Sequence, residues 1–307
     1  MGGSGKPKTI SRGGFAVGQG GAMARHKILI LMIVLYAVWG SVFLANRFCL
    51  ESFPPFMLNA FRFLPAGGFL YVFLRLKGDE GLGLRGWIDS FIVGAMLFLG
   101  GTGLLCVGQQ WVASGLSATL LASTPLWTVL FAGIWDKMPL PMEWVGLGIG
   151  IVGVALLNFD KGISGNPMGA VVILAASVIW SLGSVLNNRF KSLDKPIASA
   201  TEMIAGGVLM LVVSALIGEK VSWPPTARAS MGMFHLVVFS SIIGFTLYRY
   251  LLRTVRPALA TSYTLVNPIT ATMLGALFAG ESVSFISVAA MAVILSGVAL
   301  VFRARNI

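Results

Sequence analysis

The chain has 307 residues, of which 56% are hydrophobic and 11% are charged, and its mean hydropathy is +0.87. Soluble domains carry about 25% charged residues, so this composition excludes a water-exposed globular protein and indicates an integral membrane protein. The net charge of +11 does not indicate nucleic-acid binding, because the basic residues lie between apolar segments, where they determine membrane topology.

Residues 1–27 are rich in Gly and basic residues and lack the apolar core of a secretory signal peptide. We predict a disordered cytoplasmic tail for this stretch. Ten apolar segments follow, and each approaches the length of about 20 residues that an α-helix needs to cross a bilayer. They cover residues 28–46, 54–76, 88–108, 114–135, 141–159, 167–187, 196–218, 230–251, 257–279 and 283–302.

The loops between these segments differ in charge. Sixteen Lys and Arg residues lie in the tail, the even-numbered loops and the C-terminal end, whereas four lie in the odd-numbered loops. Because positively charged loops stay in the cytoplasm, this asymmetry predicts that both termini are cytoplasmic.

The sequence also contains an internal repeat. AVWGSVFLANRF at 37–48 resembles IWSLGSVLNNRF at 179–190, and the two phrases are 142 residues apart. GLSATLLASTPLW at 115–127 aligns in the same way with ALATSYTLVNPIT at 258–270. Matches in order at nearly constant spacing indicate a duplication.

Each copy holds five predicted spans, and five is an odd number, so the second copy must enter the membrane from the opposite side. We therefore predict an all-α integral membrane protein with ten transmembrane helices in two inverted five-helix repeats. The repeats cover residues 28–159 and 167–303, and an external linker, 160–166, joins them. Inverted repeats are typical of alternating-access transporters, whose substrate site lies near the midplane between the repeats.

Four motifs carry a resemblance to a known family: WGS at 39–41, ESFPPFMLNAFRF at 51–63, SGNPMGA at 164–170 and PALATSYTLVNP at 257–268. Together with the ten spans they resemble the drug/metabolite transporter superfamily, specifically its ten-helix EamA-domain exporters. The resemblance covers about residues 28 to 303. It implies export of small metabolites, including neutral and aromatic amino acids, from a bacterial inner membrane.

We expect no cofactor and a monomer or homodimer in the lipid bilayer. No ATPase subunit is expected, since the chain lacks a G-x-x-x-x-G-K-[ST] loop. Cys49 and Cys106 lack the spacing of metal ligands, and with the lone His235 we interpret them as packing residues. A carrier or scramblase for lipids or amphipathic drugs remains the alternative function.

Polar and aromatic side chains recur at helical spacing on four of the spans, and such faces are expected to point away from lipid. They would line a substrate cavity, or they would serve only as hydrogen bonds between helices. The candidate cavity residues are Trp39, Asn46, Thr124, Trp127, Ser177, Trp180, Ser184, Asn187, Tyr263, Asn267 and Thr270.

Pro125 and Pro268 occupy matching positions of the two repeats in the middle of predicted spans. Proline kinks a helix, so these residues are candidate hinges, with a static kink as the alternative. Glu202 lies inside a span and is a candidate for proton coupling, with a structural role as the alternative. Arg62 and Arg249 are expected to extend toward the membrane surface.

Overall fold

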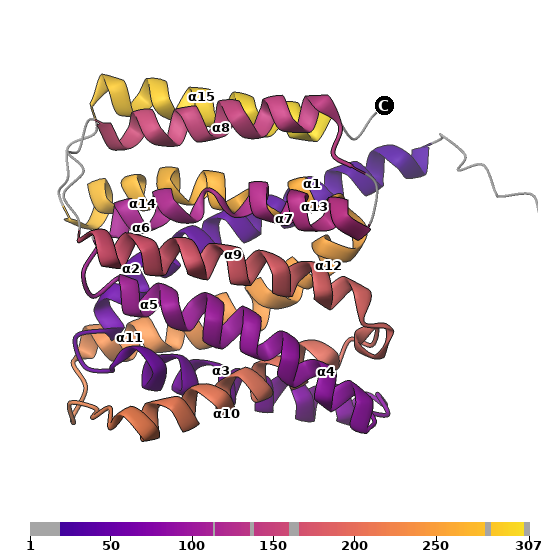
Figure 1. The fold of residues 1–307 in the computed structure, drawn as a ribbon, viewed down its shortest axis with the longest axis vertical. Coiled ribbons are helices and arrows are strands. Elements are labelled where there is room, and N and C mark those ends of the chain that lie inside the picture. The colour runs from indigo at the N-terminus through magenta and orange to yellow at the C-terminus, as the bar shows by residue number, and fades with distance from the viewer. Residues whose placement is uncertain (1–18, 113, 136–137, 160–165, 280–283, 304–307) are drawn as a thin grey trace, which may run out of the picture.

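The computed structural model describes residues 19–112, 114–135, 138–159, 166–279 and 284–303. Within these ranges the chain contains helices and no strand. Most of the helices run side by side along one direction, and their connecting loops gather at the two ends of the bundle (Figure 1).

The first half of the chain begins with a helix at Gln19, inside the stretch predicted as a tail, and residues 1–18 lie outside the described part. Its elements are α1 (Gln19–Gly40), α2 (Val42–Cys49), α3 (Pro55–Leu76), α4 (Leu84–Gly94), the π-helix η1 (Ala95–Gly103), α5 (Leu104–Gly108), α6 (Ser114–Leu121), α7 (Thr124–Trp135) and α8 (Pro141–Phe159).

The second half begins at α9, where the Asn166 side chain caps the helix by accepting a hydrogen bond from the Met168 N–H at 2.9 Å. Most of the predicted linker before it, 160–165, lies outside the described residues. The elements are α9 (Pro167–Arg189), the short 3₁₀ helix η2 (Lys191–Leu193), α10 (Ala198–Ile217), α11 (Ala227–His235), the π-helix η3 (Leu236–Phe245), α12 (Thr246–Thr254), α13 (Pro257–Thr261), α14 (Tyr263–Ala279) and α15 (Phe285–Arg303).

Seven helical segments of the described chain are long and apolar enough to cross a membrane, and shorter apolar helices cover Pro141–Leu156 and Phe285–Val301. Large apolar side chains on the outside of the bundle are exposed, for example Phe69 on α3 and Val212 on α10. Because a bilayer solvates such side chains, the outer surface fits lipid contact.

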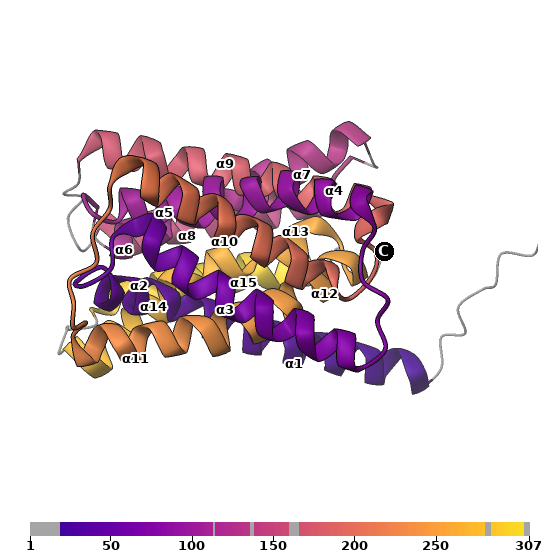
Figure 2. The same ribbon diagram turned by 90° about the horizontal axis from the view of Figure 1, so that it is seen from below.

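Helices pair in a reciprocal way between the two halves. α3 packs on α10 and α8 packs on α15 (Figures 1 and 2), while the contact of α1 with α14 has its counterpart in the contact of α9 with α7. Each pairing is retained when the repeats are exchanged. The α8 and α15 backbones approach so closely that a Cβ at Gly297 would lie 2.6 Å from the Gly146 carbonyl oxygen, so glycine is needed there.

Several predicted spans are interrupted. Span 28–46 turns at Ser41, span 114–135 breaks after Leu121, and span 257–279 breaks at Ser262. Pro125 lies in the middle of the candidate span Ser117–Ile134, as the second residue of α7, where a helix does not need its N–H. It therefore follows a break between two helices and does not kink a continuous one, and its role as a hinge stays a prediction. Pro268 lies inside α14, as predicted.

Serine and threonine side chains donate hydrogen bonds to backbone carbonyl groups at two of these breaks. Thr124 donates to the Leu121 carbonyl at 2.6 Å, and Ser262 donates to the Leu259 carbonyl at 2.7 Å. Unpaired backbone groups are costly inside a membrane, so these hydroxyl groups allow a broken helix at that depth.

Candidate substrate cavity

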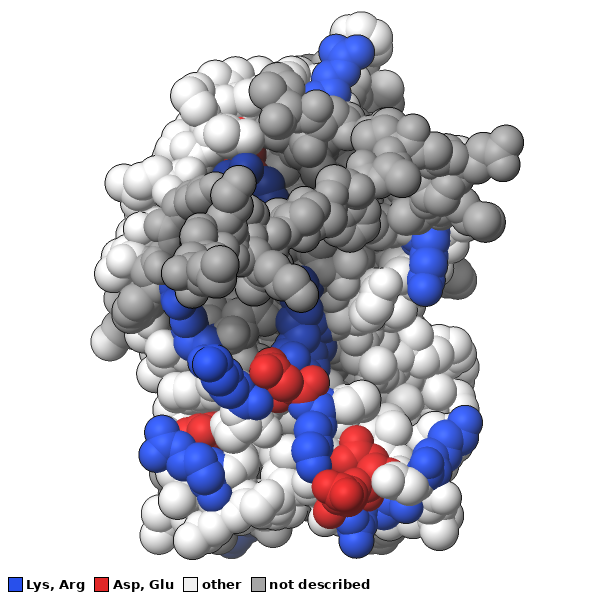
Figure 3. Space-filling view, turned by 90° about the vertical axis from the view of Figure 1, so that its right-hand side faces the viewer, with Lys and Arg blue, Asp and Glu red and all other residues white. Residues whose placement is uncertain are grey.

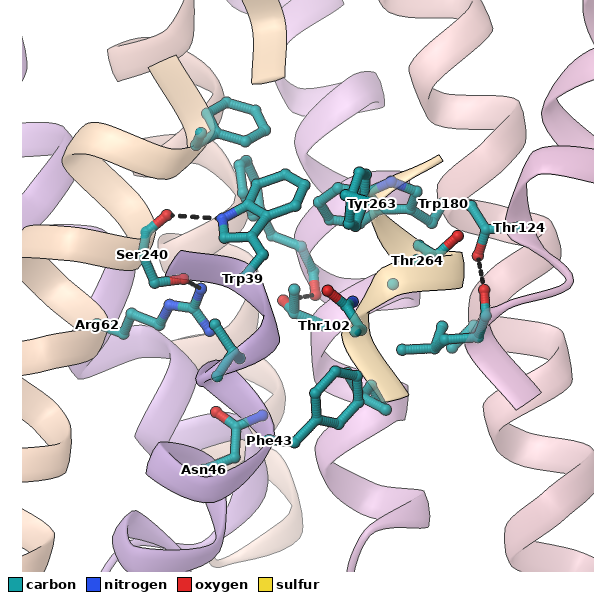
Figure 4. Close-up of a pocket in the computed structure, with 18 of the residues that line it drawn as sticks. Trp39, Phe43, Asn46, Arg62, Thr102, Thr124, Trp180, Ser240, Tyr263 and Thr264 are labelled. Atoms are coloured by element: carbon teal, nitrogen blue, oxygen red, sulfur yellow. Dashed lines mark hydrogen bonds between the residues drawn. The ribbon is translucent and has the colours of Figure 1, made fainter. Parts of the chain in front are cut away.

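A cavity lies where the two repeats meet, and it encloses about 670 Å³ of empty space, including the part open to solvent. Figure 4 shows Arg62 and Ser240 on one side of it, Tyr263, Trp180 and Thr124 on the other, and Trp39 between them. It is lined by Trp39, Val42, Phe43, Asn46, Arg62, Phe63, Phe98, Gly101, Thr102, Leu105, Leu121, Thr124, Ala176, Trp180, Ser240, Phe245, Tyr263, Thr264 and Asn267.

Aromatic rings close one end of the cavity. The Trp39 ring lies 4.6 Å from the Tyr263 ring and 5.8 Å from the Trp180 ring, in edge-to-face arrangements. Tyr248, which does not line the cavity, packs behind Trp39 at 4.9 Å. We call Trp39, Trp180, Tyr248 and Tyr263 the aromatic cluster.

The two π-helices position both tryptophans of this cluster. A Cβ at Gly101 of η1 would lie 2.7 Å from the Trp180 ring, and a Cβ at Gly244 of η3 would overlap the Trp39 indole. Gly101 and Gly244 are 143 residues apart, so they are equivalent positions of the repeats. In each repeat, a π-helix glycine therefore packs against the tryptophan of the other repeat. π-Helices are frequent at functional sites.

Trp39 is also fixed by a hydrogen bond. Its indole N–H donates to the Ser240 carbonyl at 3.0 Å, which gives that carbonyl of η3 a partner in the cavity wall. Trp180 differs, because its buried indole N–H lies at the side chains of Tyr248 and Tyr263 and makes no hydrogen bond of good geometry in the described part of the chain.

Arg62 reaches the cavity wall from α3 and is only 4% exposed. Its Nε donates to the Ser241 hydroxyl at 2.8 Å, and its Nη2 donates to the Ser240 hydroxyl at 2.6 Å. Its Nη1 is buried without a partner. The prediction that Arg62 extends to the membrane surface is therefore wrong, because the hydroxyl groups of η3 hold the guanidinium inside the bundle.

Two further polar atoms of the lining, Asn46 Oδ1 and Asn267 Oδ1, are buried without a hydrogen-bond partner in the described part of the chain. The Asn46 amide nitrogen donates to Gln109 at 3.0 Å, which orients its oxygen. The described residues of the lining include no Asp or Glu. The cavity is thus mostly apolar, with one positive charge and a few unpaired polar groups, as expected of a small-molecule site.

The structure places six of the eleven predicted cavity residues in the lining. These are Trp39, Asn46, Thr124, Trp180, Tyr263 and Asn267. Contact of these residues with a substrate stays a prediction.

The other five predicted residues lie outside the lining. Trp127, Ser177, Ser184, Asn187 and Thr270 are absent from it. Ser177 bonds to Thr124 at 2.9 Å, and Ser184 accepts from the Tyr248 hydroxyl at 2.7 Å, so these two link helices or support the aromatic cluster.

Sequence reasoning missed four polar residues of the lining, namely Arg62, Thr102, Ser240 and Thr264. Arg62 carried a usable signal, since a charged residue inside a span is a functional candidate. Ser240 and Ser241 gave the complementary signal, because two adjacent hydroxyl groups in an apolar span are suited to a buried donor.

A second buried charge lies behind the aromatic cluster. Glu202 is fully buried and forms an ion pair with Arg249, and the Asn187 amide donates to its other oxygen at 3.0 Å. Arg249 also donates to the Leu193 carbonyl. Arg249 is 5% exposed, so its predicted extension to the membrane surface is wrong, and Glu202 is the physical reason.

This ion pair does not line the cavity. Both oxygens of the Glu202 carboxylate are held by donors, and such contacts favour the structural alternative for Glu202. Proton coupling through Glu202 stays a prediction.

Comparison with known proteins gives the family. The profile of the EamA-like transporter family matches residues 26–159 and again 167–303. The uncharacterized inner membrane transporter YedA of Escherichia coli strain K12 is 39% identical over 271 residues, covering 88% of this chain and 89% of YedA. The uncharacterized transporter YdfC of Bacillus subtilis strain 168 is 25% identical, covering 91% of this chain and 92% of YdfC.

A crystal structure of a protein with 21% sequence identity has the same fold, with a TM-score of 0.76 over 92% of this chain and 98% of that chain. The doubled family match coincides with the repeat found in the sequence, which confirms that the chain is built from two related halves. Because the family profile matches both halves and the chain is similar to YedA, the chain belongs to the EamA-like transporter family, within the drug/metabolite transporter superfamily.

Proposed function

We propose that this protein is a secondary transporter of a bacterial inner membrane that exports small metabolites, with neutral and aromatic amino acids as the substrate class. The observation that carries the proposal is the mostly apolar cavity between two repeats of a transporter family. Aromatic rings such as those of Trp180 and Tyr263 suit an apolar side chain.

We further propose that the repeats lie inverted in the membrane and exchange access to the cavity between its two faces. The reciprocal helix pairing supports this arrangement, since an axis in the membrane plane would relate the pairs. Basic side chains gather over the end where the loops after α3, α9 and α12 lie (Figure 3). By the charge rule this end is cytoplasmic, and it carries the start of α1 and the end of α15.

We propose that access from the cytoplasmic end is closed in this conformation. From Trp180 in the lining, α9 leads past Ser184 to Asn187, about 10 Å farther along the helix axis. The aromatic cluster and then the ion pair of Glu202 and Arg249 occupy this path. The cavity reaches the opposite way to Asn46, close to the end of α2 at Cys49.

We infer that this conformation faces outward and that the inward-facing state requires the aromatic cluster and the ion pair to separate. Ion pairs at the cytoplasmic end also connect its loops and the end of α12. Lys195 pairs with Glu80 at 3.4 Å, and Arg253 pairs with Asp194 at 2.8 Å. These pairs are partly exposed and individually weak, so they allow the end to open.

The test is flux in vesicles that contain the purified protein. Proteoliposomes are loaded with each of the common amino acids, uptake of the labelled amino acid is followed, and lipid scrambling is measured in the same vesicles. We expect exchange of at least one neutral or aromatic amino acid without scrambling. Scrambling without amino-acid flux would replace the proposal by lipid carriage.

A further inference from the structure

The charge of the cavity wall is unbalanced. Arg62 lines the cavity, and no ion pair joins it to an Asp or Glu in the part of the chain that the structure describes. Two of its nitrogens donate to neutral hydroxyl groups, the guanidinium carbon lies 4.5 Å from the centre of the neutral Phe63 ring, and Nη1 has no hydrogen-bond partner among the described residues. A buried charge is costly unless it is paired. Binding of an anion at this guanidinium would therefore be favourable.

Arg249 shows how the same chain treats a buried arginine with a structural role. It is as buried as Arg62, yet it pairs with Glu202 and also binds the Leu193 carbonyl. The difference between the two arginines lies in the partner, because Arg62 has hydroxyl groups where Arg249 has a carboxylate. The missing carboxylate of Arg62 can come from a ligand.

The groups around Arg62 do not supply that charge. Its titratable neighbours are the thiols of Cys49 and Cys106 and the ring of His235, which bonds to the Ser41 hydroxyl at 2.8 Å. Glu219 at the end of the bundle is used by the backbone N–H of Phe56 and of Met57. Glu51 accepts from the Thr226 hydroxyl at 3.2 Å.

The rest of the lining narrows the class of ligand. Among the described lining residues there is no acidic side chain that could bind an organic cation, and Arg62 is the only charged one. A single guanidinium balances one negative charge, as on a carboxylate, but not the second charge of a phosphate monoester. The unpaired oxygens of Asn46 and Asn267 are acceptors for an ammonium group.

We propose that Arg62 is the carboxylate-binding residue of the cavity, with Ser240 and Ser241 as positioning residues, and that the ligand is a zwitterion with an apolar side chain. Arg62 is thus a specificity-determining residue. This inference rests on the proposed function for the identity of the site, since it assigns a ligand group to the same cavity.

The experiment measures binding by thermal stabilisation of the purified protein in detergent. The probes are L-phenylalanine and L-leucine, their amides, phenethylamine and phenyl phosphate. We expect the acids to bind the wild-type protein about 10- to 100-fold more tightly than the amides, because charge-assisted hydrogen bonds to a carboxylate are lost in the amide. Equal binding of acid and amide, failure of both acids to bind, or tighter binding of phenyl phosphate would overturn the proposal.

Variants then assign the preference to one residue. In Arg62→Gln the preference for acid over amide should fall to less than about twofold, whereas the exposed control Arg47→Gln should keep it. Arg62→Lys should keep the preference with about tenfold weaker binding, since lysine keeps the charge but not the planar fork. An unchanged preference in Arg62→Gln would overturn the assignment, and if that variant does not fold, the wild-type comparison and Arg62→Lys still decide it.

Flux separates this inference from the proposed function. Acids that bind with the expected preference but do not cross the membrane in proteoliposomes would remove the transport function and leave the carboxylate site. Flux that ignores the carboxylate, with acid and amide moving at equal rates, would leave transport and remove the role of Arg62.

Discussion

The two repeats share one helical plan, but their buried arginines, Arg62 and Arg249, have opposite surroundings. The second repeat pairs Glu202 of α10 with Arg249 of α12, away from the cavity. The first repeat has Asn59 and Cys106 at the equivalent positions, 143 residues earlier, and places Arg62 at the cavity without an acidic partner. The arrangement of the helices is therefore symmetric, while the placement of the buried arginines and their partners is not.

The difference indicates a division of labour between the halves. A closed ion pair stabilises one conformation of the cytoplasmic end, whereas an unpaired arginine keeps a binding group available in the cavity. The symmetric elements, such as Gly101 under Trp180 and Gly244 under Trp39, provide the backbone geometry for both. If this comparison is right, substitutions in the pair should change stability, and substitutions in the lining should change binding.

The largest effect is expected for Arg249→Met. This substitution leaves Glu202 buried and uncompensated, so we expect the free energy of unfolding to fall by about 3–5 kcal/mol. Unfolding in mild detergent with increasing SDS measures it. The double variant with Glu202→Gln should recover most of the loss, because a neutral pair remains. A double variant as unstable as the single one would contradict a paired charge.

The second largest effect is expected when a methyl group is added at the glycines that contact the two tryptophans. Gly244→Ala forces the Trp39 indole to move, and Gly101→Ala forces the Trp180 ring to move, so each should cost about 1–3 kcal/mol of stability. Gly148→Ala in α8 is the matched control, since a Cβ there meets nothing within 4 Å. Similar stability of all three variants would contradict this prediction, because it would show that the π-helices accommodate the added methyl group without loss of stability.

Removal of a cavity tryptophan should act mainly on binding. Trp180→Ala is expected to weaken competition by a bound substrate about tenfold, because an aromatic contact is worth roughly 1 kcal/mol beyond its buried area. Trp127→Ala, outside the lining, should change affinity little. Competition in proteoliposomes is compared with expression level, and a larger loss of expression than of affinity would make Trp180 a packing residue.

The smallest effect is expected from a pH gradient. Since Glu202 is held by Arg249 and Asn187 outside the cavity, we expect amino-acid flux with and without the gradient to differ less than about twofold. Glu202→Gln should then leave any gradient dependence unchanged. A strong dependence that disappears in this variant would instead establish Glu202 as a proton carrier.

Much of the fold could be predicted from the sequence because the membrane imposes simple patterns. Long apolar segments become helices, and repeated phrases such as those at 37–48 and 179–190 revealed the duplication. The breaks at Ser41 and Ser262 were missed, since hydroxyl groups can bond to the backbone of a continuous helix as well as to a broken one.

The site was predicted less completely for a similar reason. Periodicity places Ser184 and Asn187 on the face of α9 that carries Trp180, but it does not show where along the helix the cavity ends. The sequence predicts that the Arg62 and Arg249 side chains both extend to the membrane surface, because it does not reveal which partners tertiary packing brings to them. The structure gives the two arginines different partners. Arg62 bonds across the repeats to Ser241, and Arg249 pairs with Glu202 within the second repeat.

The central claim is that two related blocks lie inverted across the membrane around one shared cavity. The most direct test is compartment labelling of Arg47→Cys and Arg189→Cys, two exposed equivalents of the duplicated phrase, with a membrane-impermeant thiol reagent. The native thiols of Cys49 and Cys106 are buried. The account predicts labelling of position 47 from outside the cell and of position 189 only from the cytoplasm; labelling of both from the same side would contradict it.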